Sequence, residues 1–194
     1  MTMYRPLPLV LAGALLAGTL GGGAQTAPHE SAAGTTPFTL TSPAFADGAA
    51  LPATSEWGGG LGCHGPNKAP TLTWTNAPAG TRSFALVVVD PDAAPFATGG
   101  WVHWIVYNVP GGATRLDDAA VRRSTAGTTS FGTATYGGPC PPATGESHHY
   151  IFTLYALRAT HLAGRVLTRD ALIRAMTGRV LGATSIVGTF RRSL

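Results

Sequence analysis

Two short segments near the middle of the chain are apolar at almost every position: FALVVVD, residues 84–90, and WVHWIVYNV, residues 101–109. A strand with one solvent-facing side alternates apolar and polar residues, whereas a strand covered on both sides does not. Both segments are also rich in β-branched and aromatic residues, as strands are. We therefore expect two central strands that are covered on each side.

Similar but less apolar strand patterns occur in FTLTSPAF (38–45), PTLTWTNAP (70–78), YIFTLYALR (150–158) and TSIVGTF (184–190). The chain has 26 Gly, 15 Pro and only 11% charged residues, which favours short strands joined by turns over a helical bundle. We see no linker or repeat after Pro37, so we expect one mainly β domain over residues 37–194.

One amphipathic helix is predicted near residues 169–181, with Thr168 as its N-cap and Gly182 as its stop. Its apolar face is expected to comprise Leu172, Ile173, Met176 and Val180.

The N-terminus has the layout of a secretory signal peptide: Arg5, an apolar run of about 14 residues, and small residues before Gln25. This run is shorter than the roughly 20 residues that a spanning helix needs. We predict cleavage after Ala24, a flexible leader over 25–36, secretion into the periplasm or the medium, and no transmembrane span in the mature protein. An uncleaved anchor helix is the alternative.

Cys63 and Cys140 are the two cysteines of the chain. In an oxidising compartment such a pair is most simply interpreted as one disulfide. The alternative is two separately buried thiols.

The formal charge of +4 comes from 13 scattered basic residues, with VRRS and the terminal FRRSL as the nearest approach to clusters. Nucleic-acid binding usually requires a basic stripe with interleaved aromatic residues, so this composition argues against it.

Asp90 and Asp92 flank Pro91 where the first apolar segment ends. A carboxylate at the end of a buried strand needs hydrogen-bond donors or a cation, although DPD is also ordinary turn chemistry. Strict alternation would place Trp101, His103 and Ile105 on one face. We expect Asp90 to orient and charge His103, unless that histidine is simply a core residue.

A stiff loop, YGGPCPP, precedes His148, His149 and Tyr150. Its prolines exclude helix and interior strand, so it is suited to form the wall of a pocket. Alternation places His148 and Tyr150 on one face of the following strand and His149 on the other.

Several motifs in the same order resemble the phosphatidylethanolamine-binding protein family, also called Raf kinase inhibitor-like proteins: DPDAAP, WVHW, NVP and YGGPCPP…HHYIFTLYAL. LGCHGPNKAPTLTW resembles the bacterial YbhB/YbcL branch. The resemblance covers about residues 38–191. It implies an antiparallel β-sandwich with one or two peripheral helices.

The resemblance also implies a small pocket for phosphate, carboxylate or phospholipid head groups. Its ligand-binding residues would be Asp90, Asp92, Trp101, His103, Gly138, Pro141, Pro142, His148 and Tyr150. Three departures from the family pattern are an added alanine before Pro95, His149 in place of an arginine, and Ala69 in place of a serine.

We expect a binding protein without catalysis, cofactor or metal, since the common nucleophile, metal and phosphate-loop motifs are absent from the sequence. If Asp90 charges His103, binding of phosphate-like anions should weaken above about pH 7. The alternative function is that of an interaction protein which inhibits a secreted or host peptidase through its surface loops.

Overall fold

The computed structural model of the protein describes residues 36–192. The predicted signal peptide, and the predicted leader up to residue 35, lie outside the described residues. The described part contains these elements in order: β1 (Thr39–Thr41), a 3-10 turn η1 (Ala53–Ser55), β2 (Leu72–Thr75), β3 (Ser83–Asp90), a second 3-10 turn η2 (Pro91–Ala93), β4 (Trp101–Pro110), β5 (Arg115–Leu116), α1 (Asp118–Arg122), β6 (Thr125–Ala126), β7 (Ser147–Leu157), α2 (Arg169–Met176) and β8 (Val180–Arg191).

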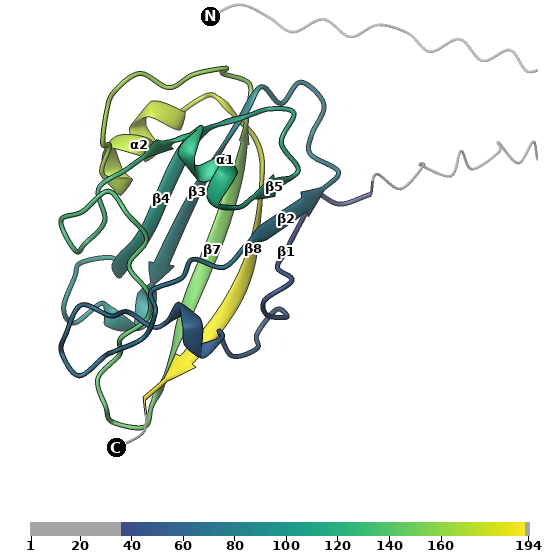
Figure 1. Ribbon diagram of the computed structural model, residues 1–194. Coiled ribbons are helices and arrows are strands. Elements are labelled where there is room, and N and C mark those ends of the chain that lie inside the picture. The colour runs from purple at the N-terminus through teal and green to yellow at the C-terminus, as the bar shows by residue number, and fades with distance from the viewer. Residues whose placement is uncertain (1–35, 193–194) are drawn as a thin grey trace, which may run out of the picture. The chain divides into compact units, whose positions relative to one another are not determined.

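The strands form two antiparallel sheets (Figure 1). A five-stranded sheet has the order β6-β4-β3-β7-β8, and a three-stranded sheet has the order β1-β2-β5. The main core lies between them, where Leu72 and Trp74 of β2 pack with Phe84 and Leu86 of β3. The predicted β-sandwich is confirmed.

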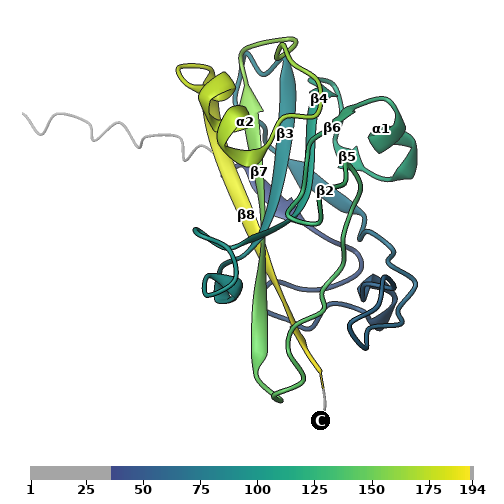
Figure 2. The same cartoon turned by 90° about the vertical axis from the view of Figure 1, so that its left-hand side faces the viewer.

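The opposite face of the large sheet is covered by α2 (Figure 2). Leu172 and Met176 of this helix pack against Ala85 and Val87 of β3. Strand β3 is therefore central and covered on both sides, as its apolar sequence predicted.

The helix is shorter than predicted. Thr168 caps its N-terminus as expected, since its side chain accepts a hydrogen bond from the Ala171 N–H. The helix ends at Met176, however, and the chain turns through Gly178, whose φ is 71°. Gly182 is therefore part of β8, where the sequence had suggested a helix stop. Ile173 and Val180, assigned to the buried face, are 49% and 41% exposed.

The expected alternation along β4 is broken by a bulge. Val88 pairs with Trp104 and Val89 with Val102, so His103 is an extra residue in β4. A bulge of this kind redirects side chains. His103 and Trp104 consequently lie toward the core that contains Tyr150, while Ile105 belongs to the opposite core, so His103 and Ile105 do not share a face.

No helix in residues 36–192 has the length and apolar character needed to cross a membrane.

Candidate functional site

A cavity of about 380 Å³ opens at one end of the large sheet. Asp90 ends β3, Trp101 and His103 begin β4, and His148 and Tyr150 begin β7. Because β3 runs antiparallel to both neighbours, these three chain segments meet at the same end of the sheet. The cavity is lined by Trp57, Leu61, Asp90, Ala93, Phe96, Trp101, His103, Phe131, Cys140, Pro141, Pro142, His148, Tyr150 and Arg192.

Asp90 is 3% exposed and accepts three hydrogen bonds. Its Oδ1 accepts from the backbone N–H groups of Asp92 and Ala93, at 2.9 and 3.2 Å, and so caps η2. Its Oδ2 lies 2.7 Å from Nδ1 of His148. The expectation that Asp90 pairs with His103 is wrong: both histidines reach the cavity, but only His148 faces the carboxylate.

His103 is buried and bonds instead to the backbone. Its Nδ1 lies 2.7 Å from the carbonyl oxygen of Gly137, which can only accept, so Nδ1 carries the hydrogen. Burial lowers the pKa of His103, more than the Gly137 carbonyl and Asp90 raise it. Burial thus favours the neutral form of His103, with Nε2 as an acceptor, over the expected imidazolium donor.

Tyr150 packs edge-on against His103, with ring centroids 5.0 Å apart. Its hydroxyl is buried near Asp90, but it makes no hydrogen bond of good geometry to any described residue. Burial first, and then the charge of Asp90, raise the pKa of Tyr150, so its hydroxyl stays protonated and can donate. A buried donor without a partner is costly in a folded protein, and a ligand acceptor would relieve this cost.

Asp92 and Gly138, two predicted ligand-binding residues, do not line the cavity. Asp92 bonds through Oδ2 to the backbone N–H and to Nδ1 of His149, on the exposed side of β7 where His149 was expected. Partial burial raises the pKa of Asp92, but the hydrogen bonds from His149 outweigh this and lower it. Asp92 therefore anchors η2 from outside.

Gly138 has a packing role. Its N–H donates to Oδ1 of Asn67 at 2.7 Å, and a Cβ at this position would overlap the carbonyl oxygen of Ser55. Only glycine allows this close approach of two backbones, which supports the cavity wall from behind. No cis peptide occurs among the described residues, so the bond before Pro95 is trans.

Sequence reasoning missed the apolar rim and one cation. Leu61 and Phe96 are 83% and 69% exposed, and both border the cavity. The rings of Trp57 and Phe131 pack on the same wall, with centroids 5.1 Å apart and planes tilted by 38°. Arg192 belongs to the basic FRRSL segment, for which the sequence predicted no place in the pocket. No local signal connects these residues to Asp90, because they come from distant parts of the chain.

The predicted disulfide is present, between Cys63 and Cys140, with Cα atoms 6.0 Å apart. Cys140 lies in the cavity wall beside Pro141 and Pro142.

Asp90, Asp92 and His148 place one ligand atom each within 4.8 Å of one another, a spacing that could hold a metal ion. Nδ1 of His148, Oδ2 of Asp90 and Oδ2 of Asp92 are already committed to the Asp90–His148 and Asp92–His149 pairs. A metal bound through these atoms would have to displace these bonds.

The family model described as phosphatidylethanolamine-binding protein matches residues 41–191. YbcL of Escherichia coli is 38% identical over 157 residues, which cover 77% of this chain and 82% of YbcL. A UPF0098 protein of Chlamydia pneumoniae is 36% identical over 156 residues, 79% of this chain and 99% of that protein. The crystal structure of E. coli YbcL superposes with a TM-score of 0.72 and 31% identity, covering 79% of this chain and 98% of that one. Together with the sandwich fold and the motifs gathered at its pocket, these matches place the chain in the phosphatidylethanolamine-binding protein family.

Proposed function

We propose that this protein is an exported, non-catalytic binding protein whose surface pocket takes small phosphate or carboxylate anions, including phospholipid head groups. The observation that carries the proposal is the hydroxyl of Tyr150, a residue of the cavity wall: this buried donor makes no hydrogen bond to the described residues. An anionic oxygen of a ligand is the acceptor that such a donor binds most strongly.

The walls support a ligand that has an apolar part as well as a charged one. Most of the rim is apolar and consists of Trp57, Leu61, Phe96 and Phe131. The polar side chains of the wall include Asp90 and His103. Burying a ring or chain against exposed Leu61 and Phe96 is favourable at about 25 cal/mol per Å². Phenyl phosphate, which joins a phosphate to one apolar ring, is therefore a suitable probe.

The described wall contains no serine, threonine or free thiol that could act as a nucleophile. The raised pKa of Tyr150 makes its hydroxyl a weak nucleophile as well. These features support binding without catalysis, which incubation with ester, phosphoester and peptide panels would test.

Export is supported by the signal-peptide layout of residues 1–24. A Mycobacterium tuberculosis relative that is 37% identical over 211 residues, covering 97% of this chain, is named "Putative lipoprotein LppC". N-terminal sequencing of the exported protein tests the proposed cleavage after Ala24.

Tyr150→Phe is expected to weaken phenyl phosphate binding by about 10- to 100-fold, since a hydrogen bond to a charged group contributes roughly 1.5 to 3 kcal/mol. The free energy of unfolding should stay the same or rise, because the change removes a buried donor that has no partner. Titration calorimetry and denaturant unfolding measure the two effects. Tyr155→Phe, on the opposite face of β7, is the control and should leave binding unchanged. Equal affinities of Tyr150→Phe and the wild type would contradict the proposal.

The neutral state of His103 predicts how binding depends on pH. Its Nε2 can accept a hydrogen from a phosphate monoester that is singly protonated, a form that is lost above a pKa of about 6. Phenyl phosphate should therefore bind more weakly at about pH 8.5 than at about pH 6, because the ligand and not His103 loses the proton. Benzoate stays fully ionised over this range and should change less. Tighter phenyl phosphate binding at the higher pH would contradict the acceptor role of His103.

Inhibition of a secreted or host peptidase is a second candidate. It is favoured by the two exposed apolar side chains at the rim, Leu61 and Phe96, since exposed apolar groups commonly mark protein contacts. An assay against secreted peptidases, with Leu61→Ser and Phe96→Ser as variants, distinguishes this role from the binding of small anions.

A further inference from the structure

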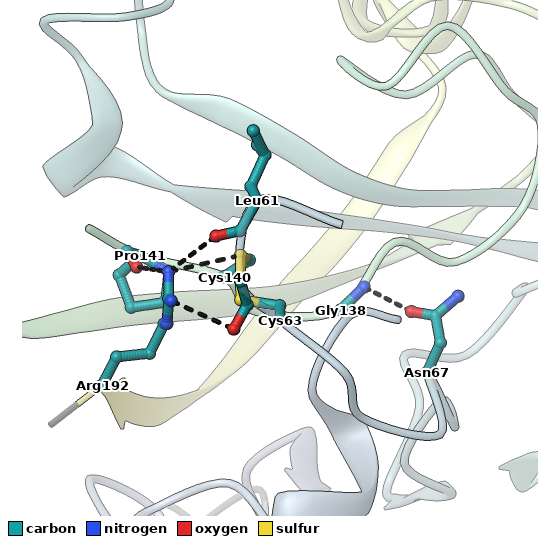
Figure 3. The surroundings of a disulfide bond; sticks show 8 residues. Leu61, Cys63, Asn67, Gly138, Cys140, Pro141 and Arg192 are labelled. Atoms are coloured by element: carbon teal, nitrogen blue, oxygen red, sulfur yellow. Dashed lines mark hydrogen bonds between the residues drawn. A yellow bond between two sulfur atoms is a disulfide. The ribbon is translucent and has the colours of Figure 1, made fainter. Parts of the chain in front are cut away.

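Arg192 is the one lysine or arginine among the described residues of the cavity wall. Its guanidinium is held by backbone carbonyl groups (Figure 3). Nη1 donates to the carbonyl oxygens of Leu61 and Pro141, each at 3.2 Å, and Nη2 donates to that of Gly62 at 3.1 Å. Nη1 also lies 3.8 Å from Sγ of Cys140.

This arrangement fixes the cation without neutralising it. No carboxylate of the described residues lies within 4.0 Å of Arg192. The Nε–H and one Nη2–H have no acceptor in that part of the chain either. Guanidinium N–H groups without an acceptor are available to donate to the oxygens of a phosphate or carboxylate.

The carbonyl groups come from two segments that the disulfide joins. Leu61 and Gly62 are the central residues of a tight turn, with φ values of 55° and 77°, which ends at Cys63. Pro141 follows Cys140 directly. The Cys63–Cys140 bond therefore sets the distance between the carbonyl groups of residues 61–62 and that of Pro141, which together hold Arg192.

We propose that Arg192 is the residue that makes this pocket select anions, and that the Cys63–Cys140 disulfide positions it. The inference rests on the proposed function and names the residue that makes the pocket prefer a negatively charged ligand. Apart from its histidines, the described wall has one acidic side chain, Asp90, and one basic side chain, Arg192, so Arg192 offsets the charge of Asp90. Without Arg192, the uncompensated charge of Asp90 would repel an anion.

The direct test compares two neighbouring arginines in the purified protein. Arg192→Gln is expected to weaken phenyl phosphate binding by about 10- to 100-fold in calorimetry. Affinity for benzyl alcohol, an uncharged ligand with the same ring, should change by less than about 3-fold, so the preference for the anion is lost. Arg191→Gln removes the same charge from an exposed residue outside the wall and should leave both affinities unchanged.

The role of the disulfide is tested by a thermodynamic cycle. Cys63→Ser/Cys140→Ser should weaken phenyl phosphate binding by about 3- to 10-fold in the wild type, but by less than about 2-fold in Arg192→Gln, because the effect acts through Arg192. Binding is measured only for those variants that circular dichroism shows to be folded. Gly62→Ala is a second variant that leaves the disulfide intact. An added Cβ would lie 2.6 Å from Nη2 and displace the guanidinium, so binding should again weaken.

The outcomes separate this inference from the proposed function. If wild-type protein binds phenyl phosphate and Arg192→Gln binds it equally well, Arg192 does not select anions, while the pocket stands. If removal of the disulfide weakens binding equally with and without Arg192, the bond does not act by positioning this side chain. If the wild type binds no phosphate or carboxylate probe, the proposed function fails and this inference fails with it.

Discussion

Replacing Cys63 and Cys140 by serine is expected to lower the free energy of unfolding by about 4 kcal/mol. The bond joins residues 77 positions apart, and closing so long a loop removes much conformational freedom from the unfolded chain. For a domain of this size the melting temperature should fall by roughly 8 to 16 °C.

The folded state should largely keep its form in this variant, because other contacts join the same segments. The side chain of Asn67 bonds both Tyr136 and Gly138, and the N–H of Trp57 donates to the carbonyl of Pro139 at 3.0 Å. Differential scanning calorimetry measures the loss, and wild-type protein treated with a dithiol reductant is the control. A melting temperature equal to that of the oxidised wild type would show that the bond does not stabilise the domain.

Asp90→Ala is expected to cost about 3 to 5 kcal/mol of stability, the usual effect of breaking a buried pair by removing one partner. The substitution leaves Nδ1 of His148 and the N–H groups of Asp92 and Ala93 without their acceptor. It also frees the ring of His148 to rotate.

Asp92→Ala is the matched control, since it removes the same side chain two residues away. Asp92 pairs with His149 at a site where both side chains are about half exposed, so the loss should stay below about 1 kcal/mol. Urea unfolding at neutral pH compares the two variants. Similar losses for both would show that the Asp90–His148 pair has no special structural role.

Local sequence was sufficient for most of the fold. The two segments without alternation became the adjacent strands β3 and β4 of the large sheet, and Thr168 capped the helix that the apolar spacing predicted. His148 and Tyr150 entered the cavity together, with His149 on the other side, because neighbouring side chains on a regular strand point to opposite faces. These features depend on backbone periodicity, which a few consecutive residues determine.

Alternation failed on β4, where a bulge turned His103 away from the face of Ile105. A bulge arises from the pairing of β4 with β3, and neither strand's own sequence shows it. The helix ended early for a related reason: the backbone turns at Gly178 so that β8 can pair along β7.

The sequence by itself determined which segments are strands, which two cysteines can pair, and which acidic, imidazole and phenol groups are available to a pocket. Only the tertiary structure decided that Asp90 holds His148 rather than His103, and that Arg192 reaches the same cavity. Two histidines of identical chemistry compete for one carboxylate, and the positions of β4 and β7 on either side of β3 decide between them. Contacts between residues far apart in the chain depend on packing, which no short stretch of sequence encodes.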